Sequence, residues 1–349
     1  MSRNYNLALI GFGNVNRALT EVIHYDGAAL AEKLGFTLTV TAITDLRFGA
    51  VVDGQGVDLG AALSLAPGQT FASLPGGMET CDNQAIICNG PADIVMEATF
   101  TNPEDGEPGL SHVRWALESG KSVCTTNKGP AAFAARELEE LAAMNGVRFE
   151  FEGAVMSGTP VLRLASGPLK GVGITGFSGI LNGTSNYVLT QMESGLSLEA
   201  AITEAQDLGY AEADPTADIG GSDVRLKVTV LAKELLGADL DAADVVTEGI
   251  TGITPGMIAE ATAKGAHWKL IGQAEMGADG KVNASVAPQM LDSTHPLAAI
   301  SGATNAVMFE TEFLGRVTIS GPGAGRQETA FALLSDIVAI DAFYRTTGS

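Results

Sequence analysis

Cysteine, histidine and tryptophan are scarce in this 349-residue chain, with three, four and two copies respectively. Cys81, Cys88 and Cys124 are too few to form a disulfide framework, so we expect a reducing compartment and a cytoplasmic protein. They form no Cys-x-x-Cys pair, which argues against a zinc site. Cys124 lies in an apolar run, where we expect a small core residue rather than a nucleophile.

Basic residues are also in short supply. The chain has 20 Lys and Arg against 41 Asp and Glu, a formal net charge of −21. Binding to a phosphate backbone needs a basic face, so we expect no nucleic-acid partner. The same argument disfavours docking on an anionic membrane. The 46% of hydrophobic residues and 17% of charged residues exclude a disordered chain.

Long hydrophobic runs are missing. The apolar run at residues 7–10 is too short for the core of a signal peptide. The longest uncharged stretch, Gly171 to Met192, contains many Gly, Ser, Thr and Asn residues, whose polar groups would need partners inside lipid. We therefore expect this stretch to be buried in protein, and we expect no membrane partner.

The first part of the chain alternates strand and helix patterns, which predicts parallel strands in a doubly wound, Rossmann-type α/β sheet. The expected strands are Leu7–Ile10, Thr37–Thr44, Ile94–Thr99, Ser122–Thr126 and Val147–Glu152, and the expected helices are Asn16–Leu34, His112–Ser119 and Ala131–Asn145. No element is predicted between Val51 and Cys88. We assign residues 1–150 to a nucleotide-binding domain.

A second domain is expected from residue 151 to 320, because the pattern changes to an α+β type. The predicted strands are Val172–Ile180, Val282–Met290 and Met308–Ile319, and the predicted helices are Leu198–Leu208 and Asp223–Leu236. A final helix, Glu328–Phe343, lies within residues 321–349, which we expect to complete the first domain.

A glycine-rich loop follows the first predicted strand and opens the first helix. Gly11 suits the tight turn, and Gly13 lets the backbone approach a pyrophosphate at the helix N-terminus. The loop predicts a dinucleotide site with contacts at Gly11, Phe12, Gly13, Asn14 and Val15. Asn16 stands where the pattern has a third glycine or alanine. We expect its side chain to crowd the helix against the strand.

The end of the second predicted strand carries residues of opposite charge. Asp45 is placed to bind the ribose hydroxyls of NAD, whereas Arg47 suits the 2′-phosphate of NADP. Asp45 is alternatively a turn residue. The sequence therefore predicts NAD or NADP without choosing between them.

Two segments of the second domain carry the most specific motifs. The first is Leu181-Asn182-Gly183-Thr184-Ser185-Asn186-Tyr187, and the second runs from Ala205 to Pro215 and continues through Asp218, Gly221, Asp223 and Lys227. With Thr125–Lys128, Glu152–Pro160 and Gly321–Gly325, they make the chain resemble homoserine dehydrogenases over nearly its whole length. The regulatory ACT domain of some members is not seen in this sequence.

The residues themselves suit an amino-acid substrate. Asp223 and Lys227 are four apart on a predicted helix and share a face, as a solvated ion pair also would. A carboxylate can bind the substrate ammonium, and a lysine can exchange the proton of its alcohol. The resemblance implies that Lys227 is the acid/base and that Asp223 orients it and contacts substrate. It also implies substrate contacts at Gly183, Thr184 and Glu212, and the acidic cluster adds Asp218.

The resemblance implies further roles in cofactor and ion binding. Lys128 matches a second lysine lying between cofactor and substrate, although it is otherwise a strand-end surface lysine. Thr99 and Gly325 match cofactor contacts. Glu152 and the carbonyls of Val155, Ser157 and Thr159 match a loop that binds a monovalent cation, sodium or potassium, although a structural turn explains the same residues.

These inferences lead to an NAD(P)-dependent homoserine dehydrogenase that interconverts L-homoserine and L-aspartate 4-semialdehyde by hydride transfer, and the resemblance implies a homodimer. One alternative is a dehydrogenase of another small amino acid such as aspartate. A second is a non-catalytic nucleotide-binding regulator, which Asn16 keeps open. None of the four histidines lies in a motif, and we expect them to be packing or surface residues.

Overall fold

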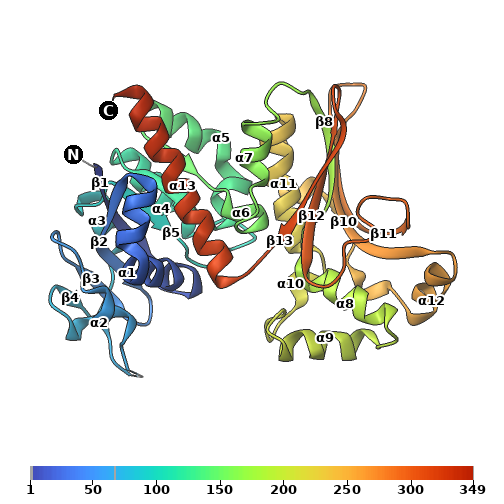
Figure 1. Ribbon diagram of the computed structural model, residues 1–349, viewed down its shortest axis with the longest axis horizontal. Coiled ribbons are helices and arrows are strands. Elements are labelled where there is room, and N and C mark those ends of the chain that lie inside the picture. Colours follow the sequence, from blue (N-terminus) through green and yellow to red (C-terminus); the bar gives the residue numbers. More distant parts are fainter. Residues whose placement is uncertain (1–2, 67, 349) are drawn as a thin grey trace. The chain divides into compact units, whose positions relative to one another are not determined.

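The computed structural model describes residues 3–66 and 68–348 (Figure 1). The chain divides into two compact units. Unit 1 contains the residues up to Ala154 together with the segment from Arg326 onward, and unit 2 is Val155–Gly325. Among the described residues, no helix has the length and apolar character needed to cross a bilayer.

Unit 1 is built on a seven-stranded sheet with the order β4-β3-β2-β1-β5-β6-β7. The strands are β1 (Arg3–Ile10), β2 (Phe36–Asp45), β3 (Gly49–Val52), β4 (Gly77–Met78), β5 (Ile94–Glu97), β6 (Ser122–Thr125) and β7 (Phe149–Glu150). The pairs β2–β1, β1–β5, β5–β6 and β6–β7 are parallel, which confirms the Rossmann-type sheet. The pairs β2–β3 and β3–β4 are antiparallel, and the sequence did not predict either β3 or β4.

Helices connect the strands of unit 1. They are α1 (Asn14–Leu34), α2 (Leu59–Leu63), α3 (Asn83–Asn89), α4 (Gly109–Glu118), α5 (Lys128–Met144) and, at the end of the chain, α13 (Arg326–Thr347), while the short helix α6 (Gly153–Met156) spans the change of unit. The helix α1 ends where Gly35 takes a φ of 78° and its N–H bonds to the carbonyl of Ala31. This is a left-handed conformation that glycine adopts readily.

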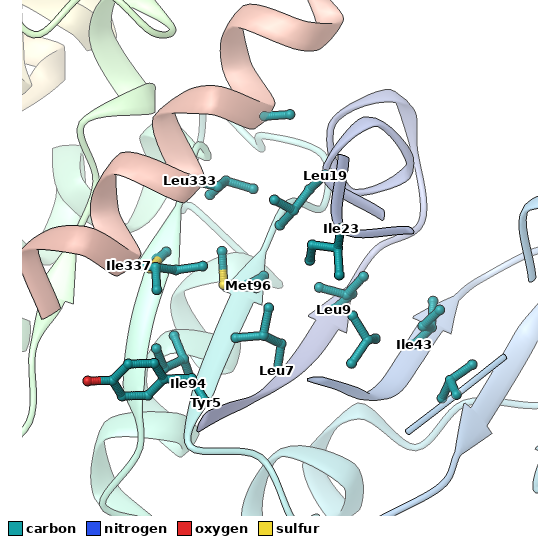
Figure 2. Close-up of a cluster of buried hydrophobic side chains, with 14 of the residues drawn as sticks. Tyr5, Leu7, Leu9, Leu19, Ile23, Ile43, Ile94, Met96, Leu333 and Ile337 are labelled. Carbon is teal, nitrogen blue, oxygen red and sulfur yellow. The ribbon is translucent and has the colours of Figure 1, made fainter. Parts of the chain in front are cut away.

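The core of unit 1 lies between the sheet and two helices that are far apart in sequence. Leu7 and Leu9 of β1 point toward Leu19 of α1 and toward Leu333 and Ile337 of α13 (Figure 2). All five side chains are fully buried. The final helix therefore belongs to the same hydrophobic core as the first strand, and burial of such side chains contributes about 1.5–3 kcal/mol each.

Unit 2 contains a six-stranded sheet with the order β13-β12-β8-β10-β11-β9. The strands are β8 (Ile174–Ile180), β9 (Val246–Thr247), β10 (Ala266–Met276), β11 (Val282–Asp292), β12 (Thr304–Thr311) and β13 (Gly315–Pro322). The pairs are antiparallel except β11–β9, and the α+β type is confirmed. The single strand predicted at Met308–Ile319 is wrong, because β12 and β13 form a hairpin that turns at residues 312–314.

The helices of unit 2 include the long predicted ones and several that the sequence did not reveal. They are α7 (Val161–Ser166), α8 (Gly183–Glu193), α9 (Leu198–Asp207), α10 (Thr216–Ile219), α11 (Ser222–Leu236) and α12 (Pro255–Ala263). The helix α11 packs closely on β10, since a Cβ atom at Gly272 would lie 2.6 Å from Val228 and 2.7 Å from Val224. This close packing fixes the position of the residues at the start of α11.

Candidate active site

The glycine-rich loop joins β1 to α1. Gly11 has a φ of 85°, and a Cβ atom there would lie 2.8 Å from the carbonyl oxygen of Ala98. Only glycine fits this turn without strain. A Cβ atom at Gly13, the residue before α1, would meet no atom of the described residues within 4 Å. The backbone at the helix N-terminus is therefore open to a ligand, as the binding of a pyrophosphate requires.

Asn16 does not crowd the helix against the strand, so this expectation was wrong. Its side chain is fully buried, and Nδ2 donates to the carbonyls of Gly11 at 2.8 Å and Met96 at 3.1 Å. The carbonyl of Ile10 lies 3.4 Å away. The amide thus joins α1 to the glycine loop and to β5 in place of the direct contact that a glycine would allow.

Asp45, the last residue of β2, is brought to the glycine loop. One carboxylate oxygen accepts from the Phe12 N–H at 3.2 Å, and the other accepts from the Arg47 N–H at 2.8 Å. The Arg47 side chain is 80% exposed, and its Nε lies 3.9 Å from Asp45. The Phe12 ring is buried against Phe71, so Phe12 offers a ligand only its backbone.

The ends of β5 and β6 are joined by a buried carboxylate that the sequence analysis missed. Glu97 Oε1 accepts from the Thr99 N–H at 3.0 Å and from the Thr99 hydroxyl. Glu97 Oε2 accepts from the Thr125 hydroxyl at 2.8 Å. Thr99 and the residues before Lys128 are therefore held by one side chain. A single acidic residue at the end of an apolar strand is the only sequence signal for it.

Burial raises the pKa of the Glu97 carboxyl, but the neighbouring His112 ring and the hydrogen bonds from Thr99 and Thr125 together outweigh it, and the net pKa lies below the usual value. The Nδ1 atom of His112 is 3.6 Å from Glu97 Oε1, and its Nε2 atom is 3.0 Å from Asn83 Nδ2. His112 is almost fully buried, in agreement with the expectation of a packing residue.

In unit 2, the buried Lys227 pairs with the partly buried Asp223, which also contacts Asn182. The Nζ atom of Lys227 lies 2.8 Å from Asp223 Oδ2 and donates to the Leu181 carbonyl at 2.7 Å. The Asn182 amide donates to Asp223 at 3.0 Å and to Asp218 at 2.7 Å. Asn182 lies in the first of the two sequence motifs, where its residue type alone predicts no role, and in the structure it orients both carboxylates.

Local chain geometry explains this arrangement. Asn182 is the N-cap of α8, and its Oδ1 atom accepts from the Ser185 N–H at 2.8 Å, which leaves Nδ2 free to reach the two acids. Gly221 takes a φ of 84° immediately before α11. The turn starts the helix with Asp223 in its first turn, so Lys227 follows one turn later on the same face.

Asp218 carries an unfavourable charge in this cluster. Burial raises the pKa of its carboxyl most, and the negative charge of Asp223 adds to this effect, while the hydrogen bond from Asn182 and the charge of Lys227 oppose it. Two neighbouring acids beside one buried lysine suit a cationic ligand such as an ammonium group. The arrangement can therefore bind an amine and move a proton at Lys227 Nζ.

The remaining predicted substrate residues, Thr184, Gly183 and Glu212, differ in their contacts and exposure. The Thr184 hydroxyl, in the first turn of α8, donates to the Tyr210 carbonyl at 2.6 Å, which joins the two sequence motifs. Gly183 is close to the Ala303 carbonyl, 2.8 Å from where its Cβ would be. Glu212 is exposed on the loop before α10, and among the described residues its carboxylate is outside the hydrogen-bonded cluster.

The predicted cation loop begins at Glu152, which is buried. Ser157 has a φ of 52°, a region that non-glycine residues enter rarely. The carbonyl of Thr159 accepts from the Val161 N–H at 2.9 Å. Within residues 3–66 and 68–348, no group of three or more His, Cys, Asp or Glu side chains is arranged to hold a metal. Val155 is buried in α6.

Gly325, the last residue of unit 2, has a φ of 127° and precedes α13. The nearby Gly323 packs directly on Asn305, because a Cβ atom there would overlap the buried Asn305 amide. Both glycines are thus required by the backbone, whether or not a ligand approaches them.

Comparison with known proteins gives one consistent result. The family model described as homoserine dehydrogenase matches residues 160–338. An NAD(+)-dependent homoserine dehydrogenase of Pseudomonas canavaninivorans is 56% identical over 338 residues, which cover 96% of each chain.

Solved structures agree with the sequence matches. A crystal structure of a putative homoserine dehydrogenase from Archaeoglobus fulgidus has a TM-score of 0.85 and 34% identity, covering 96% of this chain and 99% of the other. A hyperthermophilic archaeal homoserine dehydrogenase in complex with NADPH has a TM-score of 0.81 and 29% identity, covering 97% and 98%. The likeness therefore includes both units.

Proposed function

The chain belongs to the homoserine dehydrogenase family, and we propose that it interconverts L-homoserine and L-aspartate 4-semialdehyde with Lys227 as the acid/base. The observation that carries the assignment of Lys227 is its buried position between Asp223 and the Leu181 carbonyl. A buried lysine held by two oxygen atoms is oriented for proton transfer rather than exposed to solvent.

In the oxidative direction, the amine form of Lys227 takes the proton of the substrate hydroxyl through a water molecule and becomes the ammonium form, and in the reverse direction that ammonium group returns the proton. Asp223 fixes Nζ and contacts substrate, while Asn182 keeps Asp223 and Asp218 in place. Glu212 and Asp218 bind the substrate ammonium, and Gly183 and Thr184 contact the substrate by their backbone. Lys128, the first residue of α5, carries the second positive charge between cofactor and substrate.

The cofactor class is NAD(P), and bound NAD(P) supplies the hydride acceptor for the alcohol carbon. We propose that Gly11, Phe12, Gly13, Asn14 and Val15 hold its pyrophosphate, and that Thr99, Lys128 and Gly325 also contact it. The open space at Gly13 supports this fit. We propose a preference for NAD, since Asp45 faces the loop and would repel a 2′-phosphate, whereas Arg47 extends into solvent.

Three further proposals concern the ion, the assembly and the location. We propose that sodium or potassium binds Glu152 and the carbonyls of Val155, Ser157 and Thr159, and the left-handed Ser157 supports this. We propose a homodimer, which rests on the family resemblance. Scarce cysteine supports a cytoplasmic location.

Two other functions were considered from the sequence. The regulator without turnover depended on Asn16 disabling the cofactor loop, and the hydrogen bonds of Asn16 remove that reason. A dehydrogenase of another small amino acid would bind an ammonium group with the same acids. The buried pair of Asp223 and Lys227 supports an alcohol substrate, whose oxidation requires removal of a hydroxyl proton.

The direct test follows absorbance at 340 nm with purified protein, L-homoserine, and NAD or NADP in parallel. We expect a rise that requires homoserine and is faster with NAD. Parallel assays with and without sodium or potassium test the ion. Absence of a rise with homoserine, together with a rise with L-aspartate, would replace the proposed substrate.

A further inference from the structure

The carboxylate of Glu97 lies at the C-terminal end of β5 and divides its two oxygen atoms between two different chain segments. Oε1 faces Thr99, in the turn that follows β5, and Oε2 faces Thr125, the last residue of β6. In an open parallel sheet, cofactors bind beyond these strand ends. Glu97 is fully buried, and no step of the proposed reaction uses it.

The link through Thr125 continues to the start of α5. The Thr125 hydroxyl accepts from the Asn127 N–H at 3.0 Å while it donates to Glu97. The Asn127 side chain then caps α5, because its Oδ1 atom accepts from the Gly129 N–H at 3.0 Å. Its amide also donates to the Phe100 carbonyl at 3.1 Å, which joins the two turns directly.

We propose that Glu97 is a positioning residue for the cofactor, and that its single buried carboxylate sets the spacing between Thr99 and Lys128. This inference rests on the proposed roles of those two residues in cofactor binding. Glu97 itself touches neither substrate nor cofactor in this scheme. It acts through the turn that carries Thr99 and through the Thr125–Asn127 link that begins α5.

The chemistry of the partners requires a carboxylate. Every group that faces Glu97 in these bonds is a donor: the Thr99 N–H, the Thr99 hydroxyl and the Thr125 hydroxyl. An ionised carboxylate accepts from all of them, whereas a glutamine presents one oxygen and one NH₂ group. With the NH₂ group toward Thr125, the Thr125 hydroxyl loses its acceptor, and with the NH₂ group toward Thr99, both Thr99 donors lose theirs.

The surroundings leave little room for the two turns to shift. A Cβ atom at Gly109, the first residue of α4, would overlap the Asn127 amide and lie 3.4 Å from Glu97 Oε2. A Cβ atom at Gly129 would lie 2.7 Å from the Cα atom of Gly106. The turn that begins α5 is therefore packed against residues 106–109. A Cβ atom at Gly11 would lie 3.2 Å from Thr99 Cγ2, so the turn that carries Thr99 is packed against the glycine loop.

The test is Glu97→Gln, which keeps size and shape. We expect the NAD dissociation constant and KM to rise about 10-fold, which is the effect of losing a hydrogen bond to a buried charged group. The KM for homoserine should change less than about 2-fold, because the groups proposed to bind homoserine lie in unit 2 and only Lys128, between cofactor and substrate, lies in unit 1. This split between the two KM values is what a merely structural role would not produce.

A matched control is Asp341→Asn in α13. Asp341 is also a buried carboxylate of unit 1, and it accepts from the Tyr5 hydroxyl at 3.0 Å. Tyr5 lies in the first half of β1, whereas Glu97 pairs with Ile10 at the end of that strand. We expect Asp341→Asn to lower thermal stability without changing NAD affinity. Equal changes of NAD affinity in both variants would overturn the proposal.

A second variant covers the case in which Glu97→Gln does not fold. Thr125→Val keeps the carboxylate but cuts the link from Glu97 to Asn127. It should raise the NAD KM several-fold, and an unchanged NAD KM would overturn the proposal. If the wild-type protein itself neither binds NAD nor produces NADH with homoserine, the proposed function fails. If the wild-type protein is active and the variants bind NAD normally, only the proposed role of Glu97 is rejected, and the proposed function stands.

Discussion

The ammonium group of Lys227 lies 2.8 Å from Asp223, and both side chains are removed from solvent, with 8% and 16% exposure. The same four-residue spacing joins Lys264, the C-cap residue of α12, to Glu260 at 2.6 Å, where the side chains are 57% and 66% exposed. An exposed pair of this kind contributes about 0.3–0.5 kcal/mol. Burial and the second hydrogen bond of Lys227, to the Leu181 carbonyl, therefore distinguish the Lys227–Asp223 pair from a surface ion pair.

Replacing Lys227 by alanine should lower kcat by about 10²–10⁴-fold, since the hydroxyl proton loses its acceptor. NAD binding by calorimetry should stay within about 2-fold of wild type, because the loop residues are in unit 1. Lys264→Ala is the matched control and should leave kcat unchanged. A Lys227→Ala enzyme with near-normal kcat would show that another group transfers the proton.

Replacing Asp45 by asparagine should reduce the preference for NAD over NADP by about 10-fold. The substitution removes the negative charge beside the Phe12 N–H that would repel a 2′-phosphate. The measurement is kcat/KM with each cofactor at saturating homoserine. Arg47→Ala serves as the comparison, and a larger loss of NADP activity in that variant than in Asp45→Asn would assign cofactor choice to the arginine.

Replacing Asn16 by alanine restores a small residue at the third position of the loop pattern, yet it should destabilise the protein. The carbonyls of Gly11 and Met96 would lose their buried donor, at a cost of about 1–3 kcal/mol. Urea unfolding measures this loss. Asn145→Ala is the control. It removes an exposed hydrogen bond from the Asn145 side-chain amide to the Leu141 carbonyl and should change stability by less than about 0.5 kcal/mol. Greater stability of Asn16→Ala would restore the crowding interpretation.

Replacing Asp218 by asparagine should stabilise the fold while slowing the enzyme. The folded state raises the pKa of this carboxyl above its ordinary value of 3.8, so the folded state holds the proton to a higher pH than the unfolded chain does. Stability from this group therefore falls as pH rises through the folded pKa, and the penalty persists at neutral pH. The variant removes the penalty, so its thermal midpoint should exceed the wild-type midpoint at pH 7.

Wild type and Asp218→Asn should have equal stability contributions from this position when the pH is well below 3.8, where Asp218 is protonated in both the folded and the unfolded state. The kcat/KM for homoserine should fall about 10-fold through loss of a charged contact to the substrate amine. A variant that is less stable than wild type at pH 7 would show that the Asp218 charge is favourable in the fold.

Sequence patterns predicted the parallel strands of unit 1 well, because β1 and β2 are apolar or β-branched runs closed by glycine or charge. The β12–β13 hairpin was missed for a physical reason. Its turn contains Phe313 and Leu314, which are 75% and 59% exposed and carry no polar turn signal. The antiparallel strands β3 and β4 were missed because each is very short and is held by pairing to a neighbour rather than by its own pattern.

The site was predictable where one segment supplies several groups, as in the glycine loop and in the start of α11. It was not predictable where the site depends on contacts between residues that are far apart in sequence. Asn182 meets Asp218 and Asp223 from a different helix, and Glu97 meets Thr125 across two strands. Asn16 also took a role opposite to the one expected, because its partner on β5 is 80 residues away in sequence.

The contribution of α13 to the core of unit 1 has a consequence for how the chain matures on the ribosome. Leu19 and Leu9 are synthesised early, but Leu333 and Ile337, which cover them, come only after all of Val155–Gly325 (Figure 2). At about 5–20 residues per second, that interval lasts on the order of ten seconds. We therefore expect the apolar side chains of β1 and α1 to lack their α13 partners until translation is nearly finished.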